Sequence, residues 1–338
     1  MANVPRVRDR GLLLLLVGIP AAAFVLVFLA SLAYFRLTEE EVTESAPARM
    51  PSTTESGPPA ASGTGRVLFA LSAESSEPAE AYLASAALDG SDLRSITGPP
   101  DEGGLAADGY PALSPDGETI AFKRATAAPT GSTDPHIYLV DADGSNLRRL
   151  TTGRGAELNP AWSPDGSEIA FTRETRGHFD LFACAPDGSG LRRLTDTPRD
   201  DEDYPAWSPD GRQLAFARFE GGFEDGSGDL WVVTTKGRDE TPVLGGPGRH
   251  SSPTWSPDGE QILFVEEGHL AVMNADGTEV RPVTEGEPLD TRPTWSPDGS
   301  RILFTRDPGT ILLIDPDGTQ LARVPLDAPA GDAAWGGL

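Results

Sequence analysis

The sequence predicts an all-β fold, a six-bladed β-propeller of four-stranded antiparallel blades preceded by a single transmembrane helix. Two repeated patterns carry the propeller prediction. A Pro-x-Trp-Ser-Pro-Asp-Gly segment, with Leu for Trp in its first copy, recurs every 40 to 49 residues, at 111–117, 160–166, 205–211, 253–259 and 293–299. A second turn, such as Asp143-Gly144 between two apolar runs, occurs once in each interval. Repeats of this length are typical of propellers and solenoids.

Each Ser-Pro-Asp-Gly segment is predicted to be the turn of a β-hairpin. Proline fixes φ at the first central position, Asp tolerates the second, and Gly supplies the positive φ with which the chain leaves the turn. The Trp before the turn and a triplet such as Ile169–Phe171 after it supply the two strands. These are strands a and b of each repeat unit.

The second hairpin supplies strands c and d. In the first complete unit, Ile137–Val140 and Leu147–Thr151 flank a turn that contains Asp143-Gly144. The same pattern returns at 181–195, 230–244, 270–284 and 312–324. Four strands per unit make one propeller blade.

The two ends of the repeat region are expected to complete each other. Residues 66–97 provide strands b, c and d of a blade but no strand a, whereas Trp335 follows Trp295 by one repeat length. Joining the ends would close a ring and remove exposed sheet edges. We therefore expect one domain over residues 66–338, with six blades and with blade 1 closed by residues 331–338.

The repeat resembles that of the TolB-like (WD-like) β-propeller family. The resemblance covers residues 66–338 and is carried by the patterns P-x-W-S-P-D-G-x-x-I-A-F and D-x-D-G-x-x-x-R-R-L-T. It implies a domain used mainly for protein–protein contact, and related blades serve as non-catalytic gating domains in some serine peptidases. The sequence has no Gly-x-Ser-x-Gly motif, which excludes a complete serine peptidase.

An uncharged segment precedes the propeller. Residues 11–35 contain no charged side chain, which is long enough to cross a bilayer as a helix. Arg6, Arg8 and Arg10 precede this segment, so residues 1–10 are predicted to be a cytoplasmic tail and the propeller to be extracytoplasmic. The alternative is a cleaved signal peptide, with small residues at 30–33 as the cleavage region. Residues 36–65, rich in Ser, Thr, Pro and Gly, are predicted to be a linker.

Composition narrows the range of partners. The formal net charge is −25, which excludes nucleic acid as a favourable partner and limits membrane contact to residues 11–35. We expect the partner to be a protein of the cell envelope, which includes membrane proteins. We expect no cofactor. The single cysteine, Cys184, is predicted to be a small buried side chain of a strand c.

The loops of blades 2 to 4 that connect strands b to c and d to a are the predicted binding face, because variable loops on a rigid scaffold usually carry binding. The alternative is that they are merely solvated loops. The expected binding residues are Asp200, Asp201, Glu202, Asp203, Phe219, Phe223, Arg124, Arg173 and Arg218. The repeated tryptophans are predicted to be structural: Trp162, Trp207, Trp255, Trp295 and Trp335.

Two positions change together when the blades are aligned. The first position lies five residues before the Trp position, and the second lies two residues after the Phe of strand b. Four blades carry an acid at the first position and Arg at the second. One blade carries His250 and Glu266, and blade 1 carries Ala330 and Leu71. Strands a and b are antiparallel neighbours, so an ion pair within each blade is predicted. A third position carries Asp180 and Asp229 in blades 3 and 4, where a half-exposed Glu-Arg-Asp network is expected.

In blade 5 the three positions carry His250, Glu266 and His269. Two histidines and a carboxylate are ligand types that suit zinc or another transition metal. The alternative is that the same polar cluster is structural in every blade. No His-Glu-x-x-His motif supports a metal site, and the Asp-x-Asp-Gly turns lack the later ligands of a calcium loop.

The function predicted from the sequence is a membrane-anchored extracytoplasmic propeller that acts as a non-enzymatic scaffold for protein or ligand binding in the cell envelope. A metal-dependent lyase or hydrolase acting on an envelope polymer, with its site in blade 5, is the alternative. A third possibility is a sensor domain that signals through a membrane partner. A propeller fold does not by itself decide between them.

Overall fold

The computed structural model describes residues 58–59, 61, 65–72, 81–98, 106–126, 134–223, 227–236 and 239–336. The strands of these residues are β1 to β24. The compact unit of residues 54–338 contains them all and is described here by itself.

Four sheets contain four strands each, in sequence order and with antiparallel neighbours. Their strands are β8 (Glu157–Trp162), β9 (Ile169–Thr175), β10 (His178–Cys184) and β11 (Arg192–Arg193); β12 (Asp201–Trp207), β13 (Gln213–Phe219), β14 (Asp229–Thr234) and β15 (Glu240–Leu244); β16 (His250–Trp255), β17 (Gln261–Glu266), β18 (His269–Asn274) and β19 (Arg281–Pro282); and β20 (Asp290–Trp295), β21 (Ile302–Arg306), β22 (Thr310–Ile314) and β23 (Ala322–Arg323).

The remaining eight strands form one sheet. It joins the antiparallel group β24 (Ala330–Trp335), β1 (Arg66–Ser72), β2 (Ala81–Ala87) and β3 (Arg94–Ser95) to the antiparallel group β4 (Ala106–Leu113), β5 (Thr119–Thr126), β6 (His136–Asp141) and β7 (Arg148–Arg149). The sequence predicts six separate blades, whereas the described residues form four four-stranded sheets and one eight-stranded sheet. The reason is local, because β2 and β4 start at the same end of the sheet and pair there in parallel, through Ala81 and Ala107.

The strand that the N-terminal group lacks comes from the C-terminal part of the chain. β24 pairs antiparallel with β1, with Val67 opposite Trp335 and Leu71 opposite Ala330. The chain thus closes on itself through main-chain hydrogen bonds between its first and last described strands.

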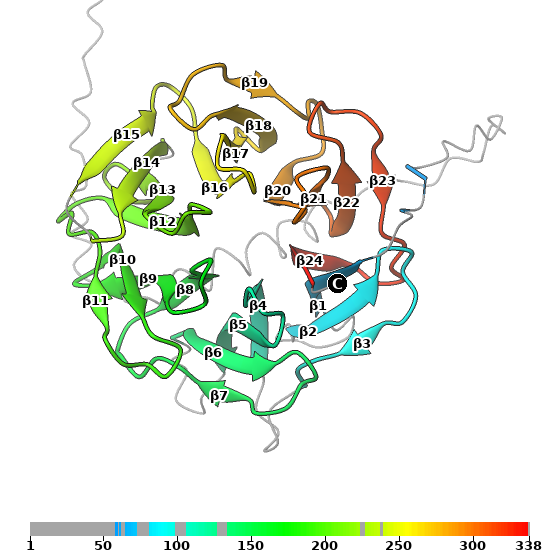
Figure 1. Ribbon diagram of the computed structural model, residues 1–338, viewed down its shortest axis with the longest axis horizontal. Helices are drawn as coiled ribbons and strands as arrows, with labels where there is room; N and C mark the ends of the chain where they lie inside the picture. The colour runs from blue at the N-terminus through cyan, green and yellow to red at the C-terminus, as the bar shows by residue number, and fades with distance from the viewer. Residues whose placement is uncertain are drawn as a thin grey trace, which may run out of the picture. The chain divides into compact units, whose positions relative to one another are not determined.

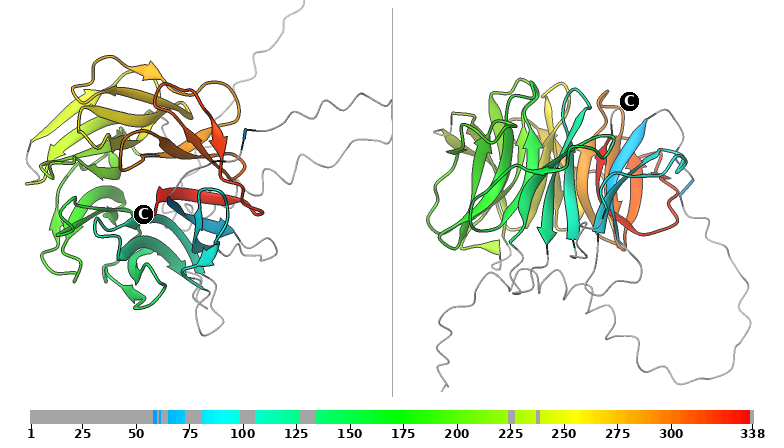
Figure 2. Two further views of the ribbon diagram at one scale, coloured as in Figure 1. Left: turned by 45° about the vertical axis from the view of Figure 1, so that its right-hand side comes forward. Right: turned by 90° about the horizontal axis from the view of Figure 1, so that it is seen from below.

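Within this unit the sheets stand around a central axis, with the first strand of each four-strand group innermost (Figure 1). Contacts between inner strands run in the closed order β4, β8, β12, β16, β20, β24 and back to β4. Figure 2 shows the strands running along the axis, so that turns and loops gather at the two ends of the ring.

The hydrophobic core is divided among the seams between neighbouring four-strand groups. Each of the six core clusters takes its buried residues mainly from two adjacent groups. The second strand of each four-strand group carries a Phe that is fully buried in these seams: Phe69, Phe122, Phe171, Phe216, Phe264 and Phe304. Full burial of one such side chain contributes about 1.5–3 kcal/mol, so face-to-face packing of the sheets is the main source of stability.

The five Ser-Pro-Asp-Gly turns have the predicted geometry. In the first, the Gly117 amide donates to the Ser114 carbonyl at 2.9 Å, and Gly117 has a φ of 77°. The Ser114 hydroxyl donates to the Asp116 carboxylate at 2.5 Å. The other four copies repeat this arrangement, with glycine φ values of 69–75°.

The predicted membrane span, residues 11–35, and the predicted cytoplasmic tail lie outside the described residues. Among the residues that the structure does describe, no helix has the length and apolar character needed to cross a bilayer. Two described residues of the predicted linker lie against the last sheet, where the Ala61 amide donates to the Arg323 carbonyl and the Arg323 amide to the Pro59 carbonyl. This end of the predicted linker therefore extends the edge of a sheet.

Candidate functional site

The predicted pairing of strands a and b within each blade is confirmed. The six residue pairs lie directly opposite one another in register: Asp108 and Arg124, Glu157 and Arg173, Glu202 and Arg218, His250 and Glu266, Asp290 and Arg306, and Ala330 and Leu71. The four acid–arginine pairs are ion pairs, with nitrogen–oxygen distances such as 2.6 Å for Arg306 Nε and Asp290 Oδ1. His250 Nε2 lies 3.4 Å from Glu266 Oε1.

These pairs are more buried than predicted. Asp108 is 3% exposed, and Glu157, Glu202 and Asp290 are fully buried. A carboxylate that is buried in this way depends on its partner, because removal of the arginine leaves an unpaired charge in the protein interior. The expectation of half-exposed networks in blades 3 and 4 is wrong, because Glu157 and Glu202 are fully buried.

The acidic run 200–203, predicted to be part of a binding face, is bonded to neighbouring strands and to the loop that follows β13. Asp201 accepts the amide hydrogens of Phe179 and Phe223, at 2.9 and 3.1 Å. Asp203 accepts from Asn159, Thr172 and its own neighbour's amide, and Asp200 accepts from the Gly221 amide at 3.2 Å. Asp201, Glu202 and Asp203 are buried, so the run is not an exposed acidic surface.

The other predicted binding residues are also largely internal. Phe219 is fully buried, its ring centroid lies 4.9 Å from that of the half-buried Phe223, and Arg124 and Arg173 are buried in their ion pairs. Arg218 pairs with Glu202 and also with Glu240. Most of the residues predicted to bind a partner are therefore bonded inside the protein, and the binding role of this face stays a prediction.

The predicted third members of the charge networks have other partners. Asp180 pairs with Arg193, at 2.7 Å, rather than with Arg173. Arg218 takes Glu240 of strand β15 as its second carboxylate, rather than Asp229. Glu157 bonds to His136 of the neighbouring group at 2.9 Å, so this network links two groups of strands.

The blade 5 cluster does not form a metal centre. His250 and His269 flank Glu266 in register, but His250 is buried and its Nδ1 lies 2.8 Å from the Gly228 carbonyl. In the described part of the chain no three His, Cys, Asp or Glu side chains are grouped so that they could hold a metal ion. The register is as the sequence predicts, but His250 Nδ1 is bonded to the Gly228 carbonyl, and His269 Nδ1 has no hydrogen-bond partner among the described residues.

The repeated tryptophans connect neighbouring strand groups. Trp162, Trp207 and Trp255 each donate from Nε1 to a carbonyl on the inner strand of the preceding group: those of Ala112, Ala161 and Ala206, at 3.1, 3.1 and 3.2 Å. Trp335 donates to Thr294 in the same way, at 3.4 Å. Trp295 is different, since its Nε1 is buried and has no hydrogen-bond partner in the described part of the chain.

The axis of the ring holds a cavity of about 390 Å³. Its walls include four of the repeated tryptophans, Trp162, Trp207, Trp255 and Trp335, and the prolines that open the five turn motifs. The lining residues follow the inner strands from their middle toward the Ser-Pro-Asp-Gly turns. We call this cavity the central channel.

One residue of each inner strand lines the channel in an unusual backbone conformation. These residues are Tyr110, Asn159, Tyr204, Ser252, Arg292 and Asp332, with φ between 50° and 58°. Positive φ is uncommon in residues other than glycine and costs on the order of 1–3 kcal/mol at each position. Each lies where the pairing of strands a and b shifts register, so the bulge directs these six side chains toward the axis.

Arg292 is the centre of the polar group in the channel. Its guanidinium carbon lies 3.6 Å from the Tyr110 ring centroid and 5.3 Å from that of Tyr204. Arg292 Nε pairs with Asp332 Oδ1 at 2.9 Å, and an Nη atom donates to Asn159 Oδ1 at 3.0 Å. Five of the six strand groups, that of Arg292 and four others, therefore meet through one arginine.

Burial shifts the titration of the groups around Arg292. It raises the pKa of Tyr110 and of Asp203, and lowers the pKa of Lys123, whose ammonium lies 5.1 Å from the Tyr110 ring centroid. The channel thus combines apolar walls with a small number of partly desolvated polar groups, which is the usual composition of a ligand site.

Sequence reasoning missed the channel residues, although a signal exists. The six residues occupy the position just before the proline of the turn motif, and in the last unit before Ala333. The position that follows is Pro in five units and Ala in the last, whereas this position is Tyr, Asn, Tyr, Ser, Arg and Asp in turn. A variable position beside a constant turn motif is expected where the scaffold presents function.

A ring of twisted four-stranded antiparallel sheets around a lined axis defines this molecule as a β-propeller. A family model, the TolB β-propeller domain, matches residues 104–204 and 203–326, which is more than half of the chain. The chain belongs to this family, and the resemblance that its repeats indicate is confirmed.

Solved structures share the fold. TolB from Acinetobacter baumannii is 22% identical, with a TM-score of 0.65 over 80% of this chain and 66% of that one, so the chain spans about two thirds of its length. A putative TolB from Agrobacterium tumefaciens is 18% identical, with a TM-score of 0.58 over 82% of this chain and 100% of that one. Hydrazine synthase of Kuenenia stuttgartiensis is 16% identical, with a TM-score of 0.63 over 81% of this chain and 46% of that one. No curated protein matches the chain.

Proposed function

We propose that the protein is a non-enzymatic scaffold of the cell envelope that binds a segment of a partner protein in its central channel. The observation that carries this proposal is the channel itself. Its indole and proline walls lead to a polar group built on Arg292, and six strained residues direct their side chains into it. Membership of the TolB β-propeller family supports a binding role.

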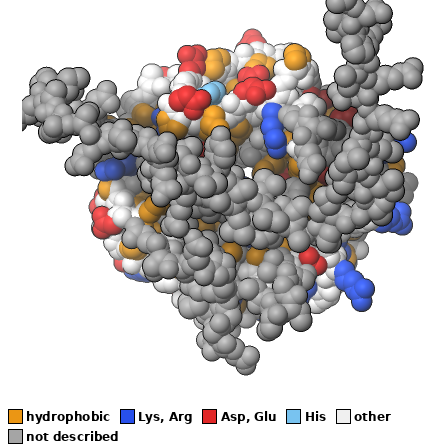
Figure 3. All heavy atoms as spheres, turned by 180° about the vertical axis from the view of Figure 1, so that it is seen from behind, with side chains coloured by type: hydrophobic (Ala, Val, Ile, Leu, Met, Phe, Trp, Pro, Cys, Tyr) orange, Lys and Arg blue, Asp and Glu red, His pale blue; other side chains and the backbone are white. Residues whose placement is uncertain are grey.

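The channel chemistry favours an extended peptide segment as the occupant. Indole and proline walls pack against apolar side chains, while Arg292, Asn159 and Asp332 offer donors and acceptors to main-chain amides. Around the channel, the net charge of −25 attracts a partner that carries Lys or Arg next to the bound segment. The part of one face that is visible in Figure 3 displays Asp and Glu side chains beside apolar ones.

We further propose that the eight-stranded sheet works as two blades, which makes the ring six-bladed. Each half has four antiparallel strands, and a single parallel residue pair, Ala81 and Ala107, joins the halves. A separate core cluster also packs between the two halves, as at the other seams. Each of the six blades then provides one of the six positive-φ residues that line the central channel.

The proposal for localisation rests on the sequence. Residues 11–35 would anchor the protein in the membrane, with residues 1–10 in the cytoplasm and the propeller outside. Protease added to intact spheroplasts should then degrade the propeller of the full-length protein. Complete protection of the propeller, with digestion only after lysis, would overturn this orientation.

The channel proposal is tested by filling the channel. Ser252→Tyr introduces the residue that two equivalent positions, Tyr110 and Tyr204, already carry at the same positive φ, so the fold should accept it. Gln320→Tyr is the matched control, because Gln320 also has a positive φ of 54° but is exposed and away from the channel.

The readout is the set of proteins cross-linked to the tagged full-length chain in cells. We expect a partner that is captured by the wild type and by Gln320→Tyr, and lost with Ser252→Tyr. Equal capture by all three proteins would show that the partner does not use the channel and would overturn the proposal.

A further inference from the structure

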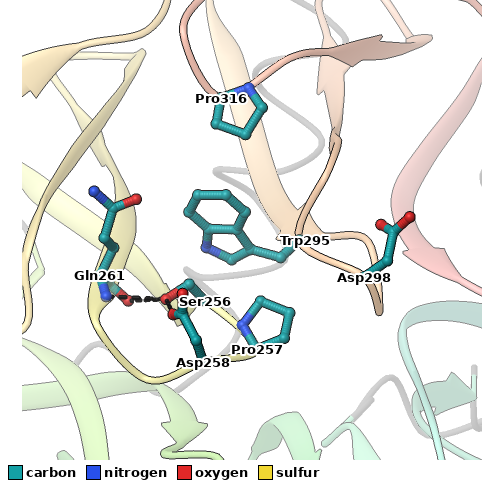
Figure 4. A pocket seen from close by; sticks show the side chains of 8 residues that line it. Ser256, Pro257, Asp258, Gln261, Trp295, Asp298 and Pro316 are labelled. Atoms are coloured by element: carbon teal, nitrogen blue, oxygen red, sulfur yellow. Dashed lines mark hydrogen bonds between the residues drawn. The ribbon is translucent and has the colours of Figure 1, made fainter.

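A second cavity lies away from the central channel, in the seam between the sheets β16–β19 and β20–β23. Its volume is about 400 Å³, and its lining includes Trp295, Gln261, Asp258, Asp298 and Pro316. Asp258 and Asp298 belong to two Ser-Pro-Asp-Gly turns and Pro316 to the turn between β22 and β23, whereas Gln261 begins β17 and Trp295 ends β20. We call this cavity the seam pocket. Figure 4 shows Trp295 at its centre, with Gln261 and Ser256 on one side and Asp298 on the other.

Trp295 differs from the other repeated tryptophans in its position and in its bonding. Four of them line the central channel and donate from Nε1 to the preceding group, whereas Trp295 lines the seam pocket. It is 7% exposed, and its Nε1 hydrogen has no acceptor among the residues that the structure describes. A buried donor without a partner is costly and calls for an explanation such as a ligand.

The other polar groups of the seam pocket also keep free bonding capacity. Asp258 and Asp298 each use one carboxylate oxygen, Oδ1, to accept from their own turn, and within the described part of the chain neither Oδ2 has a hydrogen-bond partner. The Gln261 side-chain amide makes no hydrogen bond, although its main-chain amide donates to Ser256 Oγ at 2.9 Å. No Lys, Arg or His lines the pocket. Pro257 and Pro316 add apolar surface.

We propose that the seam pocket is a binding site for a neutral saccharide. A sugar hydroxyl accepts from the Trp295 indole N–H and at the same time donates to a carboxylate oxygen of Asp258 or Asp298. Neighbouring hydroxyls bond to the Gln261 amide, and the C–H faces of the ring pack on Pro257 and Pro316. A neutral group that both accepts and donates satisfies the orphan donor and a carboxylate together, and a saccharide carries several such hydroxyls on one rigid ring.

Charged ligands fit the pocket less well. An anion would accept from Trp295 but would meet two carboxylates with no cation to balance them. An ammonium or guanidinium group would pair with Asp258 and Asp298, but it carries no acceptor and would leave the Trp295 N–H unpaired. The two alternatives therefore predict different roles for Trp295, and this makes them separable by experiment.

The experiment uses the full-length protein labelled with 5-fluorotryptophan and observed by ¹⁹F NMR. The chain has six tryptophans, and Trp295→Phe identifies the Trp295 resonance as the one that disappears. The probes are maltotriose, cellotriose and N,N′-diacetylchitobiose at millimolar concentration, with cadaverine as the cationic comparison. We expect one or more of the saccharides to shift the Trp295 resonance and to leave that of Trp207 unchanged.

Equilibrium dialysis of the saccharide that binds gives the role of the indole N–H. Trp295→Phe keeps an aromatic ring and should weaken binding about tenfold, the value of one hydrogen bond near 1.4 kcal/mol. Trp207→Phe is the control and should not change the affinity, because Trp207 Nε1 is bonded to Ala161. Gln261→Leu should also weaken binding, and its melting temperature shows that the fold is kept.

Two results would overturn the proposal. One is that no saccharide of the set shifts the Trp295 resonance. The other is that cadaverine shifts it, with an affinity that is lost in Asp258→Asn with Asp298→Asn but unchanged in Trp295→Phe, since this would identify a cation site. Neither result affects the channel proposal, because the seam pocket shares no residue with the channel.

Discussion

Arg124 and Asp108 form a buried ion pair with two parallel hydrogen bonds, from Nε to Oδ1 at 2.6 Å and from an Nη atom to Oδ2 at 2.7 Å. Arg124 is 5% exposed and Asp108 is 3% exposed. At the same register position of the strand pair β24 and β1, Ala330 lies opposite Leu71. The fold therefore accepts either a complete ion pair or a complete apolar pair at this position.

The first prediction follows from this choice between pairs. Arg124→Leu leaves the Asp108 carboxylate buried without its partner and should reduce the free energy of unfolding by about 3 kcal/mol. The double variant Asp108→Ala with Arg124→Leu recreates the combination of Ala330 and Leu71 and should recover most of that loss. Urea denaturation of the four proteins of the cycle measures the coupling. Additive losses would mean that the two residues do not stabilise each other.

The ion-pair register could be predicted from sequence because it depends on the repeat alone. An acid five residues before Trp and an Arg two residues after Phe fall opposite one another in any hairpin with this turn, as Glu157 and Arg173 show. The turns and the completion of the N-terminal group by β24 are also fixed by repeat spacing. The periodicity of the sequence therefore predicts most of the fold.

The binding residues were less accessible to sequence reasoning because burial of charge has no periodic signature. Asp201 and Asp203 look like a solvated acidic loop, yet backbone amides and hydroxyl groups surround them. The channel depends on a backbone bulge that turns residues such as Arg292 toward the axis, and the turn pattern does not reveal that bulge. Trp295 stands in the same sequence motif as Trp255. Only the structure shows that Trp295 lines the seam pocket whereas Trp255 lines the central channel.

The second prediction concerns pH and the turn aspartates. The Ser167 amide and the hydroxyls of Ser163 and Ser167 lower the pKa of Asp165 to about 2. An acid whose pKa is lower in the folded state stabilises the fold above its unfolded pKa of about 4, and this contribution is lost as the pH falls toward 2. Asp165→Asn should therefore lose less stability than the wild type between pH 5 and pH 2. Urea denaturation across this range provides the test, and parallel curves would contradict it.

The third prediction concerns Cys184, which is 1% exposed and is confirmed as a buried strand residue. Burial raises the pKa of its thiol to about 11. Because the thiolate is the reactive form, Cys184 should not react with a disulfide reagent such as DTNB at pH 8 until the protein is unfolded. The control is the same reaction in denaturant, where one thiol per chain should react. Rapid reaction of the native protein would show that this seam opens.

The fourth prediction concerns closure by β24. Deletion of residues 330–338 removes the strand paired with β1 together with the buried Ala330 and Ala333. It also exposes the edge of β1 to solvent and to other chains. We expect a fall in melting temperature of about 10 °C, which corresponds to several kcal/mol for a domain of this size. Deletion of residues 337–338 alone is the control. An unchanged melting temperature in the longer deletion would contradict closure through β24.

The last prediction compares two tryptophans of the same repeat position. Trp207→Phe removes the hydrogen bond from Nε1 to the Ala161 carbonyl, and the free energy of unfolding should fall by about 1 kcal/mol as this link between sheets is lost. Trp295→Phe removes a buried N–H that has no partner, so its stability without ligand should be equal to that of the wild type or higher. Because the substitution is the same in both variants, loss of ring area largely cancels between them. Equal destabilisation would show that the Trp295 N–H is bonded within the protein in solution, and the seam pocket would then lose the donor on which its ligand depends.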